Sequence, residues 1–587
     1  MNHRELPPNM VPLLGQERGL LLGKIVMLGL LGVPWTFIPE YWMLWAGLTA
    51  MVGWSVLVSL KRCRVAKAYR RQDEQRAYEA QNKIFGKVTR LGHITDAFVQ
   101  NLRGRSGVLI GALGKELLFY NPWAPKAGNL AVFGPAGTGK SSTMILGTLL
   151  NVWNMLGKGA LRFSIWVYDP KGELYFVSAA FRKWCGQRIF LIDPFGVTGK
   201  KTFYNPLDCV ARAVIFMTGE LRNWCAFIAN CLIPEPEGNK GKTDNSFFRE
   251  AAKLFLQRLM VYLAVFETLN CHPVRLRELV SCSESNLVMI GNKMRTYEHQ
   301  LTNRPDTSAK DKEKFRNLEI LVQGYGERLL DEMNARNFPS TRQEAEQALD
   351  IYDGSTDFGK STMHSDFPLE EILDEKSTAY VVMPGSKSGT HGQFSSWVSA
   401  QMIETIARQE KPSKILLLLD EMGNMPRLPD DTIKKNFALL RSLQARTATF
   451  WQSPSQPKIY GDDIAKLIMD QSSLLAAWSI RDPDMAKEFE RRSGQTTVKK
   501  RSYAKDPKAM EHSWSYSSQE ALEPVLSETE ILQLPDDEML VAISGQKMLR
   551  MRRIPFWKIG LMRRVAQKNP SEPHDGYPPQ DTVEWPY

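Results

Sequence analysis

The most constraining feature of this 587-residue chain is a glycine-rich segment, GPAGTGKS, at residues 134–141. It follows the apolar run NLAVFG at 129–134 and precedes an apolar segment with helical spacing that extends to residue 156. The segment satisfies the phosphate-loop pattern G-x-x-x-x-G-K-[ST] in full, in the strand-to-helix context that this pattern requires. We therefore expect an α/β fold in which the loop follows a buried strand.

The residue types in this loop suit the phosphates of a nucleotide. Its glycines let the backbone curl so that N–H groups point at phosphate oxygens, and the following helix adds the positive end of its dipole. Lys140 is expected to reach the β- and γ-phosphates of ATP, and Ser141 to ligate Mg²⁺. The alternative is a glycine-rich turn that binds nothing. The predicted nucleotide-binding residues are Gly134, Pro135, Ala136, Gly137, Thr138, Gly139, Lys140, Ser141 and Ser142.

A second motif supplies the acids that ATP hydrolysis would need. The apolar run ILLLL at 415–419 ends in Asp420 and Glu421. As the end of a strand in the same sheet, Asp420 can orient the metal and Glu421 can polarise the attacking water. Such a strand end could also be only a solvated turn. Together with a complete phosphate loop, it is interpreted as the second half of an ATPase site.

Two further polar positions carry weaker signals. Gln452 follows the apolar run TATFW, and it could sense the γ-phosphate or simply cap a strand. Arg441 and Arg446 precede that run. Either arginine could be a finger that reaches the ATP of a neighbouring subunit, although surface arginines are more often solvated.

Short apolar runs recur along the chain and predict a sheet. FSIWVYDP at 163–170 and QRIFLIDP at 187–194 alternate with helical segments, which indicates a parallel sheet covered on both faces. From about 210 to 375 the spacing is helical, with hardly a strand signal, and this predicts an all-α insertion. Further apolar runs lie at 106–111, 116–120, 377–384, 414–421, 446–453, 473–480 and 538–543.

The first sixty residues hold two apolar stretches, 19–38 and 41–60, each long enough to span a bilayer as a helix. The connection between them has no Lys or Arg, whereas six basic residues crowd between Lys61 and Arg71. The positive-inside rule then predicts a transmembrane hairpin with both termini in the cytoplasm. A cleaved signal peptide and a buried core hairpin are the alternatives.

These signals predict an α/β nucleotide-binding domain with a parallel-rich sheet, an inserted all-α domain and an N-terminal two-helix membrane anchor. The predicted order is a cytoplasmic N-terminus (1–18), the hairpin (19–60), a basic linker (61–105), the first part of the nucleotide-binding domain (106–210), the insertion (211–375), the second part (376–560) and a disordered tail (561–587).

The charge balance indicates the class of partner. The formal net charge is +11 and the pI is about 9.1, which favours nucleic acid or an anionic membrane surface. A basic juxtamembrane segment with an ordinary remainder is the alternative. The seven cysteines form no CxxC pair and no His-linked metal spacing, which argues against a disulfide framework or a zinc site.

Taken together, the motifs resemble the type IV secretion coupling proteins, the TraG/TraD class of conjugative DNA-transfer ATPases. GPAGTGKSS, LLDEMGNMP and WQSPSQPKIYG match that family's phosphate loop, acid strand and sensor. DPKGEL at 169–174 is a segment that few other ATPases carry. DPFG, YNPLD, EPVLSETEILQLP and the closing GQKMLRMRRIPFW also follow as in the family, so the resemblance extends from the hairpin to about residue 557.

The resemblance implies a RecA-like motor that hydrolyses ATP with Mg²⁺ in a hexameric ring at the bacterial inner membrane. It implies catalytic roles for Glu421, Gln452 and Arg441, because the family's finger lies eleven residues before the sensor glutamine. The implied partners are DNA bound without sequence preference, the relaxase and other secretion substrates, and inner-membrane components of the secretion system. Two features depart from the family: the outward loop is short, and Asp470-Gln471 replaces the frequent Asn-Cys.

Three functional hypotheses follow. The first is a coupling protein that recruits a relaxase–DNA substrate and drives it to the secretion channel. The second is a DNA translocase of the FtsK or HerA kind. The third is a receptor for effector proteins with little motor activity of its own.

Overall fold

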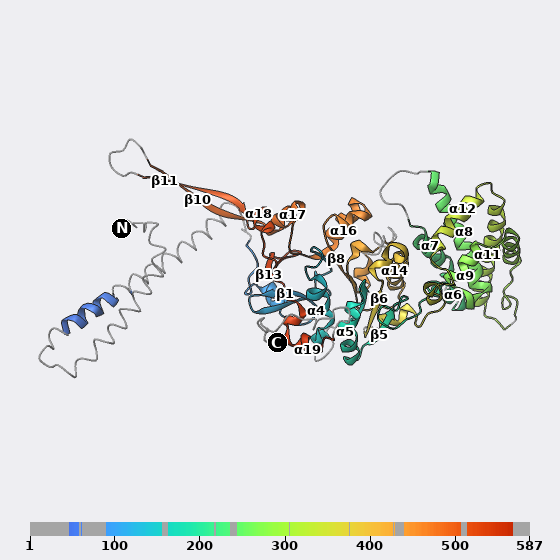
Figure 1. Ribbon diagram of the computed structural model, residues 1–587, viewed down its shortest axis with the longest axis horizontal. Coiled ribbons are helices and arrows are strands. Elements are labelled where there is room, and N and C mark those ends of the chain that lie inside the picture. Colours follow the sequence, from blue (N-terminus) through green and yellow to red (C-terminus); the bar gives the residue numbers. More distant parts are fainter. Residues whose placement is uncertain are drawn as a thin grey trace. The chain divides into compact units, whose positions relative to one another are not determined.

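The computed structural model describes residues 46–57, 60, 90–154, 162–216, 219–234, 244–304, 306–374, 376–425, 428, 439–505 and 514–567. The chain divides into two compact units. One comprises Met1–Thr89 with Gly494–Pro524, and the other comprises Arg90–Ser493 with Val525–Tyr587 (Figure 1). The larger unit contains the phosphate loop.

An eleven-stranded sheet forms the framework of the larger unit, in the order β2-β1-β13-β12-β9-β3-β8-β7-β4-β6-β5. The strands are β1 (Val108–Leu113), β2 (Glu116–Tyr120), β3 (Asn129–Phe133), β4 (Ser164–Asp169), β5 (Arg188–Ile192), β6 (Ser377–Val382), β7 (Ile415–Leu419), β8 (Ala445–Trp451), β9 (Ser472–Ala477), β12 (Glu538–Ile543) and β13 (Leu549–Arg552). Every apolar run that the sequence marks as a strand is a strand here.

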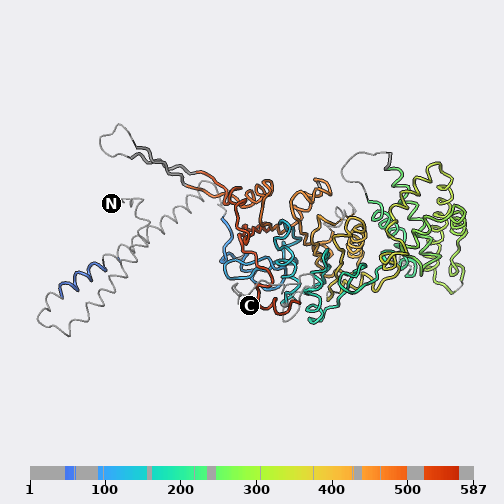
Figure 2. Tube along the Cα trace, in the orientation of Figure 1, coloured from blue at the N-terminus to red at the C-terminus, as the bar shows by residue number. Residues whose placement is uncertain are grey.

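The sheet is only partly parallel. From β9 to β5 all neighbours run parallel, whereas β2, β1, β13 and β12 pair antiparallel. Short turns at Gly114 (φ 64°) and Gly545 (φ 73°) explain two of these pairs, β1 with β2 and β12 with β13. The other two pairs, β12 with β9 and β1 with β13, join strands that lie far apart in the chain, and Figure 2 shows β1 beside β13. The sequence predicted the parallel part and did not predict this edge.

Two layers of apolar side chains cover the sheet, one on each face. Along β3, Leu130 and Val132 point into one layer, and Ala131 and Phe133 point into the other. The first layer is completed by α4 (Leu146–Leu149), α5 (Glu173–Trp184) and α19 (Gly560–Val565). The second is completed by α14 (Gly385–Ala407), α16 (Asp462–Gln471) and the helical region that follows β5. Coverage of both faces explains why these strands are apolar throughout.

Between β5 and β6 the described chain forms helices and no strand, as its spacing predicts (Figure 1). Their side chains continue the second apolar layer without a break. The helices are α6 (Asp208–Ile215), α7 (Leu221–Leu232), α8 (Asp244–Phe266), η6 (Thr268–Asn270), α9 (Pro273–Val280), α10 (Glu284–Arg295), α11 (Ala309–Met333), α12 (Phe338–Leu349), α13 (Asp357–Ser361) and η7 (Leu369–Leu373). The larger unit also contains α3 (Ala97–Asn101), η5 (Val152–Asn154), α17 (Pro483–Ser493), α18 (Glu528–Leu532) and η10 (Phe556–Lys558).

The smaller unit contains a helix over 46–57 and a hairpin of β10 (Gln495–Lys505) with β11 (Trp514–Pro524). The register runs from Gln495 opposite Pro524 to Lys505 opposite Trp514. The sequence did not predict these two strands, because charged and polar residues dominate β10 and hide any apolar alternation.

Much of the N-terminal prediction falls outside the described residues. This holds for the first predicted span (19–38), the start of the second, and the linker up to residue 89. In the part of the chain that is described, no helix is both long enough and apolar enough to cross a membrane. The helix α19 extends into the segment predicted as a disordered tail, and residues 568–587 are not described. The domain boundaries stay predictions.

A buried arginine ties the helix after the phosphate loop to the sheet. Arg182 of α5 is 1% exposed. Its guanidinium donates to the Leu149 carbonyl at 3.1 Å, to Gln187 Oε1 at 2.6 Å and to Thr378 Oγ1 at 2.5 Å. These contacts join α4, α5 and β6, so the guanidinium satisfies acceptors that lie out of reach of water.

We expect Arg182→Met to lower the free energy of unfolding by about 3 kcal/mol, because the buried acceptors lose their donors. The midpoint of urea denaturation of the full-length protein measures this loss. The matched control is Lys183→Met on the exposed side of the same helix. Its free energy of unfolding should stay within about 0.5 kcal/mol of the wild-type value. Equal stability of the two variants would contradict the structural role of Arg182.

Candidate nucleotide-binding site

The phosphate loop lies at the carboxyl end of β3, between β9 and β8. Gly137 (φ 72°) and Gly139 (φ 79°) occupy the left-handed region that side-chain-bearing residues avoid. The backbone N–H of Gly134 donates to the Trp451 carbonyl at 3.0 Å and so anchors the loop to β8. A helical segment follows, first η4 (Ser141–Ile145) and then α4 (Leu146–Leu149). It ends earlier than the apolar spacing predicts, at a turn that leads into η5.

Lys140 is folded inward over the loop. The side chain is buried, and Nζ donates to the carbonyls of Gly134 at 2.6 Å and Pro135 at 3.0 Å. Burial lowers the pKa of Lys140, while Asp420 and Glu421 act in the opposite direction. A phosphate bound at this loop would give the ammonium group a charged partner. This interaction would offset the free-energy cost of burying the charge.

Ser141 and Asp420 meet although they lie far apart in the sequence. The Ser141 hydroxyl donates to Asp420 Oδ2 at 2.7 Å. Burial raises the pKa of Asp420, and the Ser141 hydrogen bond partly offsets this rise. A hydroxyl and a carboxylate beside a phosphate cradle form the oxygen-rich donor set that Mg²⁺ prefers, so these residues fit the predicted metal. The structure thus brings together the two residues predicted to hold it.

Glu421 follows Asp420 in a left-handed backbone conformation, with φ 47°. Its N–H donates to Asp420 Oδ1 at 3.0 Å, and its Oε2 accepts from Asn424 Nδ2 at 2.9 Å. The ammonium group of Lys171 lies 3.7 Å from Oε1. A non-glycine residue keeps this conformation only where its surroundings hold it, and such positions concentrate at functional sites.

Lys171 belongs to the DPKGEL segment, which the sequence marked only through the family resemblance. This segment follows β4, the neighbour of β7 in the sheet. Asp169 at the end of β4 accepts from the Tyr175 N–H at 2.9 Å and fixes the turn. Burial raises the pKa of Asp169 to about 7. The segment therefore shapes the sheet edge beside Asp420 and directs Lys171 toward Glu421.

Gln452 lies at the carboxyl end of β8, between the phosphate-loop strand and the acid strand. Its N–H donates to Gln456 Oε1 at 2.7 Å. Gln456 begins η9 (Gln456–Tyr460) and packs against Gly423 in η8 (Met422–Asn424). A Cβ at Gly423 would lie 2.2 Å from Gln456 Cδ, so the two chain segments touch. Gln456 thus connects the predicted sensor position to the turn that holds Glu421.

The two candidate finger arginines have different environments. Arg446 is buried, and it donates to the carbonyls of Pro122 at 2.8 Å and Arg441 at 3.0 Å. Arg441 is exposed and precedes β8, at the edge of the sheet opposite the phosphate loop. The seven residues of β8 span roughly 23 Å at the usual rise per residue. Arg441 therefore lies away from the loop of its own chain, and Arg446 is engaged in the fold.

The sequence missed one contact on the other side of the loop. Trp478, directly after β9, is fully buried, and its indole N–H donates to Thr138 Oγ1 at 2.9 Å. The sequence gives only a weak signal for this contact: a tryptophan at the end of a buried strand needs an acceptor for its indole N–H. Both neighbours of β3 thus hold the loop, β8 through the Trp451 carbonyl and β9 through Trp478.

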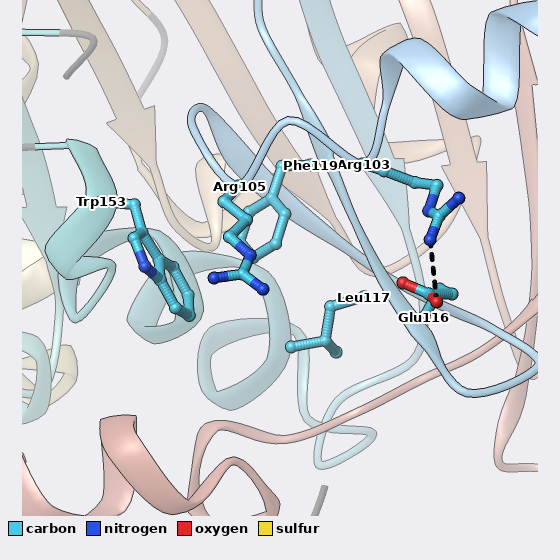
Figure 3. A pocket seen from close by; sticks show the side chains of 6 residues that line it. All are labelled: Arg103, Arg105, Glu116, Leu117, Phe119 and Trp153. Atoms are coloured by element: carbon cyan, nitrogen blue, oxygen red, sulfur yellow. Dashed lines mark hydrogen bonds and ion pairs between the residues drawn. The ribbon is translucent and has the colours of Figure 1, made fainter. Parts of the chain in front are cut away.

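A cavity of about 190 Å³ lies elsewhere, between β2, η5 and the segment that follows α3 (Figure 3). An ion pair of 2.9 Å joins Arg103 to Glu116 at its rim, and Arg105 lies over the ring of Trp153. Trp153 follows the far end of the helix that begins at the loop. The cavity is smaller than the roughly 300 Å³ at which ligand pockets usually begin, so we assign no ligand to it.

Comparisons with known proteins agree on one family. Residues 95–575 match the family model described as "Type IV secretory system Conjugative DNA transfer". The chain is 21% identical over 449 residues to the protein VirD4 of Agrobacterium fabrum, a match that covers 74% of this chain and 60% of VirD4. The chain thus spans about 60% of the length of that relative.

Solved structures show the same fold. The unbound bacterial conjugative coupling protein TrwB aligns with a TM-score of 0.53 at 15% identity, over 80% of this chain and 93% of TrwB. TrwB in complex with ADP and Mg²⁺ aligns with a TM-score of 0.50 at 14% identity, over 80% of this chain and 94% of TrwB. Since the family model matches most of its length, this chain belongs to the conjugative DNA-transfer family of the type IV secretory system.

Proposed function

We propose that this protein is the ATP-hydrolysing coupling protein of a conjugative type IV secretion system. It would recruit DNA with its bound relaxase and drive this substrate to the secretion channel. The observation that carries the proposal is the hydrogen bond between Ser141 and Asp420 beside a buried Lys140. It assembles the parts of a phosphate-loop ATPase in a chain of the DNA-transfer family.

Each residue of the site has its own role in the binding and hydrolysis of ATP. The loop N–H groups cradle the phosphates, and Lys140 turns from the loop carbonyls to the phosphate oxygens. Ser141 and Asp420 would hold Mg²⁺, which would supply positive charge beside the phosphates. Glu421 orients the attacking water and accepts its proton, with Asn424 fixing one carboxylate oxygen. Gln452 senses the γ-phosphate from the neighbouring strand end.

Several features beyond the site support the wider proposal. The TrwB complex with ADP and Mg²⁺ has a similar fold, so we infer the same ligands here. The net charge of +11 suits a motor that grips DNA through its phosphates without reading bases. We infer a hexameric ring in which Arg441 reaches the site of a neighbouring subunit. We also infer that the hairpin predicted at 19–60 anchors the ring to the bacterial inner membrane, with both termini in the cytoplasm, where it meets the secretion system's membrane components.

The first test is turnover. We expect Mg²⁺-dependent ATP hydrolysis that DNA stimulates. Lys140→Ala should abolish nucleotide binding, and Glu421→Gln should lower turnover by about a hundredfold or more while nucleotide binding persists. Phosphate release and conjugative transfer between cells measure both effects. A receptor without motor activity would transfer substrate normally with either variant, and an FtsK- or HerA-like translocase would leave plasmid transfer intact when deleted.

The contact between Gln456 and Gly423 gives a sharper test. Gly423→Ala places a methyl group on Gln456, which must move and release the N–H of Gln452. We expect turnover to fall about tenfold or more and nucleotide affinity to stay within about threefold, because the change reaches Glu421 and Gln452 but not the phosphate loop. The matched control is Gly389→Ala in α14, where a Cβ meets nothing within 4 Å. Loss of nucleotide binding in Gly423→Ala would contradict this division of roles.

The position of Arg441 predicts complementation between subunits. Arg441→Ala should lower turnover by about a thousandfold while nucleotide binding persists. Mixed rings of Arg441→Ala and Lys140→Ala subunits should recover part of the activity, because the intact finger of one subunit meets the intact loop of the other. Mixed rings of Lys140→Ala and Glu421→Gln are the control, since no site in them then has both Lys140 and Glu421. Equal activity of the two mixtures would refute a finger that acts between subunits.

A further inference from the structure

The order and direction of the strands place Arg553 next to the phosphate loop of its own chain. β13 runs antiparallel to β12, which runs antiparallel to β9, so β13 ends at the edge where β3 and β9 end. Arg553 follows β13 directly. The sequence gives no sign of this proximity, because Arg553 lies more than four hundred residues after the loop.

The Arg553 side chain lies against the loop backbone. Its Nη1 is 3.5 Å from the point that a Cβ at Gly139 would occupy. Its guanidinium lies over the ring of Trp478, 5.9 Å from the centroid, and Trp478 itself donates to Thr138 of the loop. Trp478 therefore holds both the loop and the arginine.

The Arg553 guanidinium has the carboxylates of Asp536 and Asp537 within electrostatic reach but is not ion-paired with either. Among the described residues, no hydrogen bond or ion pair of this side chain is formed. Asp536 and Asp537 act on it only electrostatically: Asp536 Oδ1 accepts from Ser479 at 3.2 Å, and the Asp537 carbonyl accepts the Arg553 N–H at 2.7 Å. Burial lowers the pKa of Arg553. A half-buried cation of this kind gains stability from an anion placed beside it.

The side of the loop limits which part of a nucleotide Arg553 can meet. Asp420 and Glu421 approach from β7, beyond β8, whereas Arg553 approaches from β13, beyond β12 and β9 on the other side of β3. In this loop type, the backbone N–H groups cradle the α- and β-phosphates, and the lysine reaches the β- and γ-phosphates. Arg553 is therefore placed for the phosphates that remain after hydrolysis.

We infer that Arg553 is a second cation of the nucleotide site, which binds the α- and β-phosphates of the nucleoside di- or triphosphate held by the loop of its own chain. This inference rests on the proposed function. Arg553 is a binding residue that acts on ADP and ATP alike, and it differs in this from Arg441, whose effect would be confined to turnover. Trp478 positions it by stacking.

The test compares nucleotide affinity among variants of the full-length protein in detergent. Arg553→Met keeps the apolar stem over Trp478 and removes the charge. We expect it to weaken the binding of ADP and of a non-hydrolysable ATP analogue by a similar factor, about ten- to a hundredfold, as for the loss of a charge-assisted hydrogen bond. Arg553→Lys should recover part of the affinity.

Control variants distinguish a failure of the inference about Arg553 from a failure of the proposed function. Arg552→Met, at the exposed neighbouring arginine, should bind like wild type. Lys140→Ala should abolish binding, and if wild type itself binds no nucleotide, the proposed function fails. If wild type binds, Lys140→Ala does not, and folded Arg553→Met binds ADP normally, only the inference about Arg553 is overturned. A loss confined to the ATP analogue would place Arg553 at the γ-phosphate and overturn it as well. If Arg553→Met does not fold, Arg553→Lys decides, since the inference predicts ADP binding there that is weaker than wild type, and unchanged ADP affinity would overturn it.

Discussion

The site depends on the parallel pairing of β3 with its neighbours. Because β9, β3, β8 and β7 run in one direction, their carboxyl ends meet at one edge of the sheet. The phosphate loop, Gln452 and the two acids all follow such strand ends. The strand pairing brings these segments close enough for a 2.7 Å hydrogen bond between Ser141 and Asp420.

Polar residues at this edge are costly to bury, and each has a specific partner. Lys140 donates to loop carbonyls, Asp420 accepts from Ser141, and Asp169 accepts backbone N–H groups. Burial lowers the pKa of Lys140 and raises the pKa values of Asp420 and Asp169, so it favours the neutral form of each side chain. A nucleotide with its metal would supply the opposite charges, so the free site already has the arrangement that its ligand stabilises.

The family assignment and the geometry complement each other. The family model establishes the family and the likeness to TrwB shows the fold, but neither says how a given residue acts in this chain. The contacts do: Gln456 links the sensor position to the turn at Glu421, Lys171 faces Glu421, and Arg446 serves the fold. Arg441, by contrast, is exposed and precedes β8 at the opposite edge of the sheet, so the role between subunits stays a proposal.

The sequence alone determined the strands that are apolar throughout, the helical region after β5, and the residues of the phosphate loop and acid strand. These signals are local, since burial on both faces demands continuous apolar runs and a phosphate cradle demands glycines at fixed spacing. Tertiary structure alone decided the antiparallel edge, the β10–β11 hairpin, and the meeting of Trp478 and Arg553 with the loop. The hairpin escaped prediction because polar residues dominate β10. The other features depend on which distant strands pair, and a pairing between residues far apart in the sequence leaves no mark in the local pattern of either strand.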